Sequence, residues 1–295
     1  MRTSFSAAGI GYGLLAYGIW GFFPLYFRQL SHVPPMDVLS HRAVWACVFV
    51  GLLLTLRGRW ANVAAIVRAP RQLGMLALAA LLVGSNWLVF LWAVANQQVV
   101  ASSLGYFLTP LVNILLGLLV LKEKLNRLEW VSVALAIAAI GNEVATLGSL
   151  PWVSLFLAGT FGTYGLVRKQ VPVDALSGLW LETLWMLPVC ALYALWMAQT
   201  GHTVFAVPSA STAGWLIGAG IMTALPLMAF AAATQRLDLA TVGMLMYINP
   251  TMQFLTAIYL FDEPLQTARL ISFSLIWISL LVFSWSTWRK YRTTA

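Results

Sequence analysis

The amino-acid sequence predicts an all-α integral membrane protein with ten transmembrane helices arranged as two inverted five-helix repeats. Three observations predict this fold: the composition, a series of apolar segments, and a similarity between the two halves of the chain. Of the 295 residues, 61% are hydrophobic and 9% are charged, whereas about a quarter of the residues in soluble proteins are charged. A soluble domain of this length could not bury so much apolar side chain. The composition therefore indicates that most of the chain lies in lipid.

Ten apolar segments account for most of the sequence. They cover residues 9–27, 38–56, 73–95, 99–121, 128–145, 151–167, 175–198, 213–234, 239–261 and 268–288. Each segment has a length suited to one transmembrane helix, which needs about 17 to 25 residues. None of them shows the alternating pattern of a strand in a transmembrane barrel. Because most connections are very short, we expect no extramembrane domain.

The positive charges predict the orientation of these helices. If the N-terminus is cytoplasmic, 14 of the 17 Lys and Arg residues fall on the inner side. Only Arg28 and Arg269 fall on the outer side, and Arg42 lies just inside a segment. Such an excess of cations is typical of cytoplasmic loops. We therefore predict that both termini are cytoplasmic, and that the net charge of +8 reflects orientation and not nucleic-acid binding.

The fourth and ninth segments resemble each other. A shift of 140 residues superimposes Pro110 on Pro250, Asn113 on Gln253 and Glu123 on Glu263. Because each copy would hold an odd number of helices, the second copy must enter the membrane from the opposite side. We expect the first repeat at residues 1–147 and the second at residues 148–295. A chance similarity between two apolar helices is the alternative.

Inverted repeats predict a transport mechanism. They give two nearly equivalent conformations, each open to one side, as alternating access requires. Proline inside a helix removes a backbone hydrogen bond and favours a kink, so the matched Pro110 and Pro250 are candidate gating residues. Proline is also common in membrane helices in general, which is the simpler explanation for Pro24, Pro188 and Pro226.

Polar and aromatic side chains at bilayer depth are candidates for the substrate-binding wall, since each needs a partner or water. The candidates are Tyr17, Trp20, Asn86, Trp87, Tyr106, Asn113, Tyr164, Tyr247 and Asn249. Ordinary packing explains each of them singly. As a group, they have the mixed aromatic and hydrogen-bonding character of a ligand pocket. Segments one, three, four, six, eight and nine would form the cavity.

Ionisable groups inside the segments are candidates for gating or ion coupling. Arg42 and its neighbour His41 lie near the outer end of the second segment, where Arg42 could snorkel to the surface as an anchor, act in gating or contact an anion. Glu143 is close enough to an outer end that we expect it to reach water. Glu182 lies about two turns deep, as either a proton carrier or a structural hydrogen-bonding group.

Catalysis and cofactors have little support in the sequence. The three histidines show no H-E-x-x-H pattern, there is no G-x-x-x-x-G-K-[ST] phosphate loop, and Cys47 and Cys190 match no zinc or redox spacing. We therefore predict that the chain is not an enzyme and holds no metal or cofactor.

Several stretches resemble the RarD branch of the EamA, or drug/metabolite, transporter superfamily. Among them are A-Y-G-I-W-G-F-F-P-L-Y-F from Ala16, S-L-G-Y-F-L-T-P-L-V-N from Ser103 and Y-I-N-P-T from Tyr247. The resemblance implies ten helices in inverted halves, a bacterial inner membrane, and export or exchange of small metabolites. It assigns no role to single residues. The chain departs from the pattern at Glu143 and at Asn249, which makes Asn249 a candidate for tuning specificity.

Together these observations predict a secondary transporter that moves a small metabolite or drug-like compound, such as an amino acid or amine. Its partners would be that small molecule and the lipid bilayer, with no nucleic acid, and it would act as a monomer or homodimer. The alternative is a membrane sensor or scaffold that transports nothing.

Overall fold

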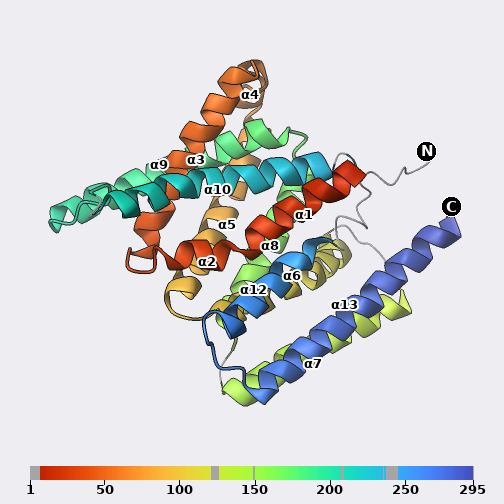
Figure 1. Ribbon diagram of the computed structural model, residues 1–295. Coiled ribbons are helices and arrows are strands. Elements are labelled where there is room, and N and C mark those ends of the chain that lie inside the picture. The colour runs from red at the N-terminus through yellow and green to blue at the C-terminus, as the bar shows by residue number, and fades with distance from the viewer. Residues whose placement is uncertain are drawn as a thin grey trace.

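The computed structural model describes residues 7–120, 126–148, 150–206, 209–234, 236 and 245–294, and the regular structure in these ranges is entirely helical (Figure 1). The helices are α1 (Ala7–Gly21), α2 (Phe23–Arg28), α3 (Pro35–Leu56), α4 (Trp60–Val67), α5 (Pro70–Ala95), α6 (Val99–Val120), α7 (Arg127–Leu147), α8 (Trp152–Gln170), α9 (Ala175–Gln199), α10 (Ala210–Thr234), α12 (Ile248–Tyr259) and α13 (Thr267–Thr294). Within these ranges, seven helical stretches are long and apolar enough to cross a membrane. The predicted class, an all-helical membrane protein with several spans, is therefore confirmed.

Each of the ten predicted segments overlaps a helix, but the first is not continuous. It is broken at Phe22, between α1 and α2. Pro24, in the first turn of α2, has no N–H to donate to the carbonyl oxygen of Trp20 four residues earlier. The side chain of Gln253 on α12 donates its Nε2–H to that oxygen instead, at 3.3 Å. The break therefore exposes a backbone acceptor that a distant helix satisfies.

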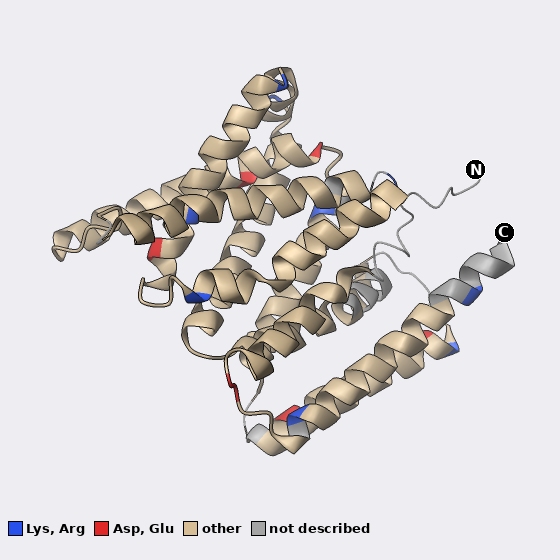
Figure 2. Cartoon of the chain, viewed as in Figure 1, with Lys and Arg blue, Asp and Glu red and all other residues tan. Residues whose placement is uncertain are grey.

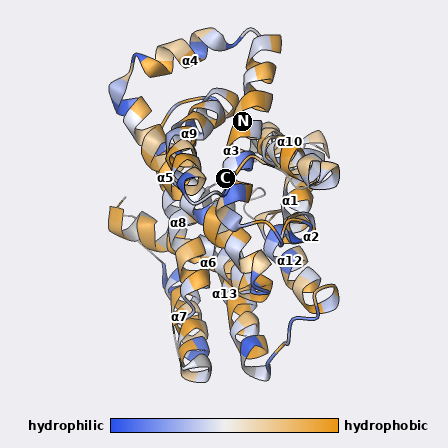
Figure 3. Ribbon diagram, turned by 90° about the vertical axis from the view of Figure 1, so that its left-hand side faces the viewer, coloured by the Kyte–Doolittle hydropathy of each residue, from blue (hydrophilic) through white to orange (hydrophobic). Residues whose placement is uncertain are grey.

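Helix α4 is an element that the sequence analysis missed. It lies across one end of the bundle, between α3 and α5 (Figure 3). Val63 and Ile66 are buried, whereas Trp60 and Val67 are exposed. An apolar face of this kind, next to several arginines, is typical of a helix in the plane of the membrane interface. Eight residues give too short a pattern to distinguish from a loop.

The remaining helices pack in a bundle with a separate pair beside it. In the bundle, α6 packs on α8, α1 on α10, α3 on α9 and α10, α5 on α8 and α9, and α12 on α1 and α6. Helices α7 and α13 lie side by side and make few contacts with the others (Figure 1). Glycines permit two close crossings: a Cβ on Gly105 of α6 would lie 2.8 Å from the carbonyl oxygen of Ser154 on α8. A Cβ on Gly220 of α10 would meet the backbone of Trp45 and Ala46 on α3.

Hydrogen bonds between small polar groups join α7 to α13. The Ser279 hydroxyl donates to the carbonyl oxygen of Ser132 at 2.7 Å, and the Ser272 hydroxyl donates to that of Ala139 at 3.2 Å. At one end of the pair, Glu143 and Arg269 form an ion pair of 3.9 Å. Glu143 is only 2% exposed, so the expectation that it reaches water was wrong. Its helix ends further along the chain than its position in the apolar segment suggested, and α13 covers it.

Charged side chains are rare along the helices, and most of the ribbon in Figure 2 is tan. One buried charge joins the two halves of the chain. Glu263, in the connection from α12 to α13, accepts hydrogen bonds from the backbone N–H groups of Val99 and Val100 at 2.7 and 2.8 Å. These donors begin α6 and have no partner within the helix. A carboxylate at a helix N-terminus also interacts favourably with the helix dipole.

Candidate functional site

Arg42 lies at the centre of a buried cluster formed by several helices. Its side chain on α3 donates from Nε to the hydroxyl of Thr223 on α10 at 2.7 Å. The guanidinium carbon lies 3.9 Å from the ring centroid of Trp87 on α5, and 5.2 and 5.4 Å from those of Phe27 and Phe23 on α2. Arg42 is 2% exposed. The alternative in which Arg42 snorkels to the surface was therefore wrong, because aromatic rings and Thr223 hold it inside the protein.

The Arg42 charge is only partly compensated by these contacts. Burying an ion costs several kcal/mol, whereas a cation–π contact returns about 0.5–2 kcal/mol and one hydrogen bond from a charged group about 1.5–3 kcal/mol. Nη1 of Arg42 is buried and has no hydrogen-bond acceptor among the described residues. None of the ion pairs in the described ranges includes Arg42. The cluster thus contains a cation that lacks a protein counter-ion in the described part of the chain.

Asn86, beside Trp87 on α5, forms a hydrogen-bond network with two other helices. Its Nδ2 donates to the carbonyl oxygen of Leu157 at 3.0 Å and to the hydroxyl of Thr160 at 2.9 Å, both on α8. Its Oδ1 accepts from the Tyr106 hydroxyl of α6 at 3.2 Å. The predicted residues Asn86, Trp87, Tyr106 and Arg42 therefore lie together.

Glu182 lies in a second cluster, on α9. Its carboxylate accepts a hydrogen bond from the Tyr164 hydroxyl of α8 at 3.2 Å. Nη1 of Arg168, also on α8, lies 3.2 Å from the other carboxylate oxygen, although without hydrogen-bond geometry. Glu182 is 1% exposed. Unlike Arg42, it has a protein counter-ion.

Asp174 fixes the start of the helix that carries Glu182. Its side chain accepts the backbone N–H of Ser177 at 3.1 Å and so caps α9. Burial alone would raise the pKa of Asp174, but the bonds from Ser177 and Asn62 and the nearby charge of Arg59 keep it below its usual value. The cap therefore stabilises the helix at neutral pH, and this contribution is lost as the pH falls through the lowered pKa.

A third cluster is aromatic and amide in character. On α1, Tyr17 and Trp20 make an edge contact at 5.5 Å, and Phe230 of α10 touches both rings. Gln253 of α12 bonds to the backbone of Trp20 and to the side-chain oxygen of Asn249, the latter at 2.7 Å. Tyr247, just before α12, packs against the main core. The predicted Tyr17, Trp20 and Asn249 are thus connected through Gln253.

The other predicted gating residues have separate settings. His41 is near the carbonyl oxygen of Val204 at 3.2 Å and contacts the Phe205 ring. The carbonyl oxygen of Pro250 accepts from the Ser103 hydroxyl of α6 at 2.7 Å. The side chains of Pro110 and Asn113 lie outside the described part of the chain.

Sequence reasoning did not identify Gln253 or Arg168 as site residues. Arg168 was counted only among the cations that set the orientation, and Gln253 only as the repeat partner of Asn113. A signal was available for Gln253, because an amide near proline at bilayer depth needs a partner. For Arg168 the sequence carried no such signal, because it lies in a basic pair near the end of its segment.

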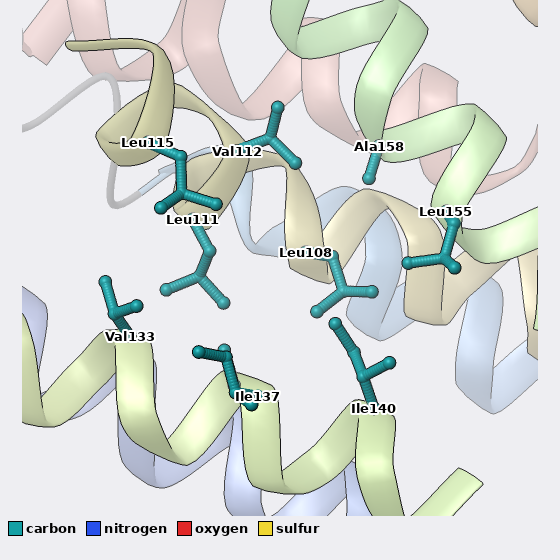
Figure 4. Close-up of a pocket in the computed structure, with 10 residues that line it drawn as sticks. Leu108, Leu111, Val112, Leu115, Val133, Ile137, Ile140, Leu155 and Ala158 are labelled. Carbon is teal, nitrogen blue, oxygen red and sulfur yellow. The ribbon is translucent and has the colours of Figure 1, made fainter. Parts of the chain in front are cut away.

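Two apolar pockets lie apart from these clusters. One, of about 80 Å³, is lined by aliphatic side chains of α6, α7 and α8 (Figure 4). The other, of about 520 Å³, is lined chiefly by α9, with Val67 and Leu73 at one side. Ligand sites combine an apolar lining with a few polar groups that orient the ligand. Because neither lining contains a charged group or an amide, we place the candidate site at the three polar clusters.

Comparisons with known proteins identify the family of the chain. Residues 7–141 match the model of the EamA-like transporter family. The chain is 43% identical over 295 residues to an uncharacterized transporter of Pseudomonas aeruginosa, covering 99% of this chain and 98% of that protein. It is 40% identical over 275 residues to protein RarD of Escherichia coli K12, covering 93% of each.

A solved protein structure shares the fold across nearly the whole length. It matches with a TM-score of 0.62 at 17% identity and covers 97% of this chain and 99% of that one. Relatives that are about 40% identical over nearly their full length show the family to which this chain belongs. The chain is a multi-pass membrane protein and belongs to the RarD branch of the EamA-like transporter family.

Proposed function

We propose that the protein is a secondary transporter that moves a small metabolite or drug-like compound across the bacterial inner membrane by alternating access. In this proposal residues 1–147 and 148–295 are inverted five-helix repeats. The observation that carries it is an offset of 140 residues between the starts of three pairs of helices. Helices α3 and α9 begin at Pro35 and Ala175, α5 and α10 at Pro70 and Ala210, and α7 and α13 at Arg127 and Thr267, each pair 140 residues apart.

The helix contacts support the same relationship. If α1 corresponds to α8, α3 to α9, α5 to α10, α6 to α12 and α7 to α13, then exchanging the halves should reproduce the list of contacts. The packing of α1 on α10 has its counterpart in that of α8 on α5, and the packing of α6 on α8 in that of α12 on α1. Likewise, the contact of α10 with α3 corresponds to that of α5 with α9.

The seam between α7 and α13 supports a twofold axis at residue level. A two-fold interface is self-complementary, so a contact from one half has a mate with the roles exchanged. The Ser132–Ser279 and Ala139–Ser272 contacts join equivalent pairs of positions, since 132 and 272, and 139 and 279, differ by the same 140 residues, although in both bonds a serine of α13 donates to a carbonyl oxygen of α7.

Two of the three polar clusters, those of Arg42 and of Gln253, have hydrogen bonds between the proposed repeats. Arg42 bonds to Thr223, Asn86 to Thr160, and Trp20 to Gln253, and each bond joins one proposed repeat to the other. Rocking of one repeat against the other would change these contacts, so we infer that the substrate binds between the repeats. We infer that the nine predicted wall residues contribute to this site, that Pro110 and Pro250 permit bending, and that both termini are cytoplasmic.

Transport by the purified protein is the direct test. Proteoliposomes that contain only this chain should exchange at least one compound from a panel of amino acids, amines, organic acids and antibiotics, whereas protein-free liposomes should not. If folded protein gives no flux for any compound, the alternative of a sensor or scaffold replaces the transporter.

Glu182 is the residue to test for proton coupling. We expect Glu182→Gln to lose accumulation driven by a pH gradient while retaining exchange of substrate between the two sides, because only the former needs a titrating group. Glu143→Gln is the matched control, since Glu143 is another buried acid with an arginine partner but lies in the α7–α13 pair. If gradient-driven transport by Glu182→Gln equals that of the wild type, Glu182 carries no proton.

A further inference from the structure

Arg42 and Glu182 occupy equivalent positions in the two proposed repeats. They are 140 residues apart, and each is the eighth residue of its helix, in α3 and α9. Both are almost fully buried. Two equivalent positions thus carry side chains of opposite charge, and the groups that surround these two side chains differ.

The difference lies in their counter-ions. The Glu182 carboxylate lies 3.2 Å from Nη1 of Arg168 and accepts a hydrogen bond from the Tyr164 hydroxyl. The Arg42 guanidinium contacts aromatic rings and donates to the neutral Thr223 hydroxyl. None of the ion pairs in the described ranges includes Arg42. Its buried Nη1 has no hydrogen-bond acceptor in the part of the chain that the structure describes. A buried guanidinium with a free donor is a group that an anion would complete.

We propose that Arg42 binds the carboxylate of the transported substrate, so that the cargo is a carboxylic acid with an apolar or aromatic body. This proposal rests on the transporter function above and narrows its substrate class. An amine without an acidic group is disfavoured, because the site already holds an uncompensated positive charge. A zwitterionic amino acid satisfies the requirement through its carboxylate.

The geometry around Arg42 suits this class of ligand. Because Nε is used by Thr223 and the Trp87 ring lies against the guanidinium, the buried Nη1 is the donor left for an incoming carboxylate. Arginine presents its N–H groups in a planar fork that matches the two oxygens of a carboxylate. Trp87, Phe23 and Phe27 then offer an apolar surface beside the charge. Because Arg42 is buried, a ligand reaches it only when the repeats separate.

A structural role is the competing explanation, in which Arg42 merely holds α2, α3, α5 and α10 together through its rings and Thr223. Both explanations predict loss of stability when Arg42 is replaced. They differ in the chemistry of ligand binding, because only a binding role makes the protein distinguish an acid from its neutral amide.

The test uses purified full-length protein in nanodiscs and three matched pairs of probes: propionate and propionamide, benzoate and benzamide, and 3-phenylpropionate and 3-phenylpropionamide, with 3-phenylpropylamine as the cation. Thermal denaturation and titration of tryptophan fluorescence measure binding. Arg28→Gln is the matched control, because Arg28 is exposed, bonds to the carbonyl oxygen of Leu260 and lies over the Phe261 ring.

We expect at least one acid to stabilise the wild type and Arg28→Gln, with its amide and the amine giving no shift. Arg42→Gln should bind that acid at least about 30-fold more weakly than the wild type. Arg42→Lys should recover part of the affinity. The proposal is overturned if no acid binds, if each amide binds as well as its acid, or if Arg42→Gln binds like Arg28→Gln. If Arg42→Gln does not fold, the difference in affinity of the wild type for each acid and its amide tests the proposal.

Flux measurements separate this proposal from the transporter function. If a neutral or cationic compound is transported and no acid binds, the protein is a transporter and the carboxylate site is refuted. If acids bind through Arg42 and no compound is transported, the site stands and the chain is a sensor of organic acids.

Discussion

At the scale of single residues, the site is defined by polar groups whose partners lie on other helices. The sequence could single out Arg42 and Glu182, because a charge within an apolar segment is rare. It could not assign Arg168 to Glu182 or Thr223 to Arg42, since these contacts depend on how distant helices pack. For Asn86 the sequence indicated a polar wall residue, and the structure adds that the protein itself engages both ends of its amide.

Replacing Asn86 by leucine should destabilise the protein. The change retains the approximate size of the side chain but leaves the Tyr106 hydroxyl without its acceptor, and each buried polar group left unpaired costs about 1–3 kcal/mol. The thermal unfolding temperature in detergent should fall clearly below that of the wild type. Ser85→Ala is the control, because the Ser85 hydroxyl donates to the carbonyl oxygen of Leu82 within its own helix. Equal unfolding temperatures for the two variants would show that the Asn86 network contributes nothing.

At the scale of elements, the sequence predicted where helices occur better than where they bend or end. The apolar segments located α3, α5, α9 and α10 with small errors at the ends, because long runs free of charge have few alternatives in lipid. The break at Phe22 and the interfacial helix α4 were missed. Both depend on neighbours in space: the carbonyl freed by Pro24 is satisfied by Gln253, and α4 is held through its buried Val63 and Ile66.

Close helix packing makes a prediction for two glycines of α10. Gly220→Ala should push α10 away from α3, because the added Cβ meets backbone atoms of Trp45 and Ala46 that cannot rotate away. Overpacking of this kind costs about 1–3 kcal/mol and would also displace Thr223 from Arg42. Gly214→Ala is the control, since it has no neighbour within 4 Å.

Unfolding temperature and carboxylate binding measured on both glycine variants check this prediction. Gly214→Ala should match the wild type or exceed it, because alanine favours helix. A Gly220→Ala protein as stable as Gly214→Ala would mean that α3 and α10 are not in close contact.

At the scale of the whole molecule, the charge distribution predicts an orientation that cysteine labelling can check. The native Cys47 and Cys190 are buried and free, so they should react little with a membrane-impermeant maleimide. Cysteine at the exposed position of Ser31 should be labelled in intact cells, once the outer membrane is made permeable. Cysteine at the exposed position of Arg68 should be labelled only after the inner membrane is opened. The reverse pattern would place both termini outside.

The pairing of α7 with α13 has a consequence for how the chain is made. Helix α7 leaves the ribosome more than a hundred residues before α13, its main partner. Until the last helix is inserted, Glu143 lacks its ion-pair partner Arg269. The carbonyl oxygens of Ser132 and Ala139 likewise lack the hydroxyl groups of Ser279 and Ser272. The seam along α7 therefore acquires its polar partners only after the last helix has been inserted, so we expect a chain that ends before α13 to be much less stable than the whole protein.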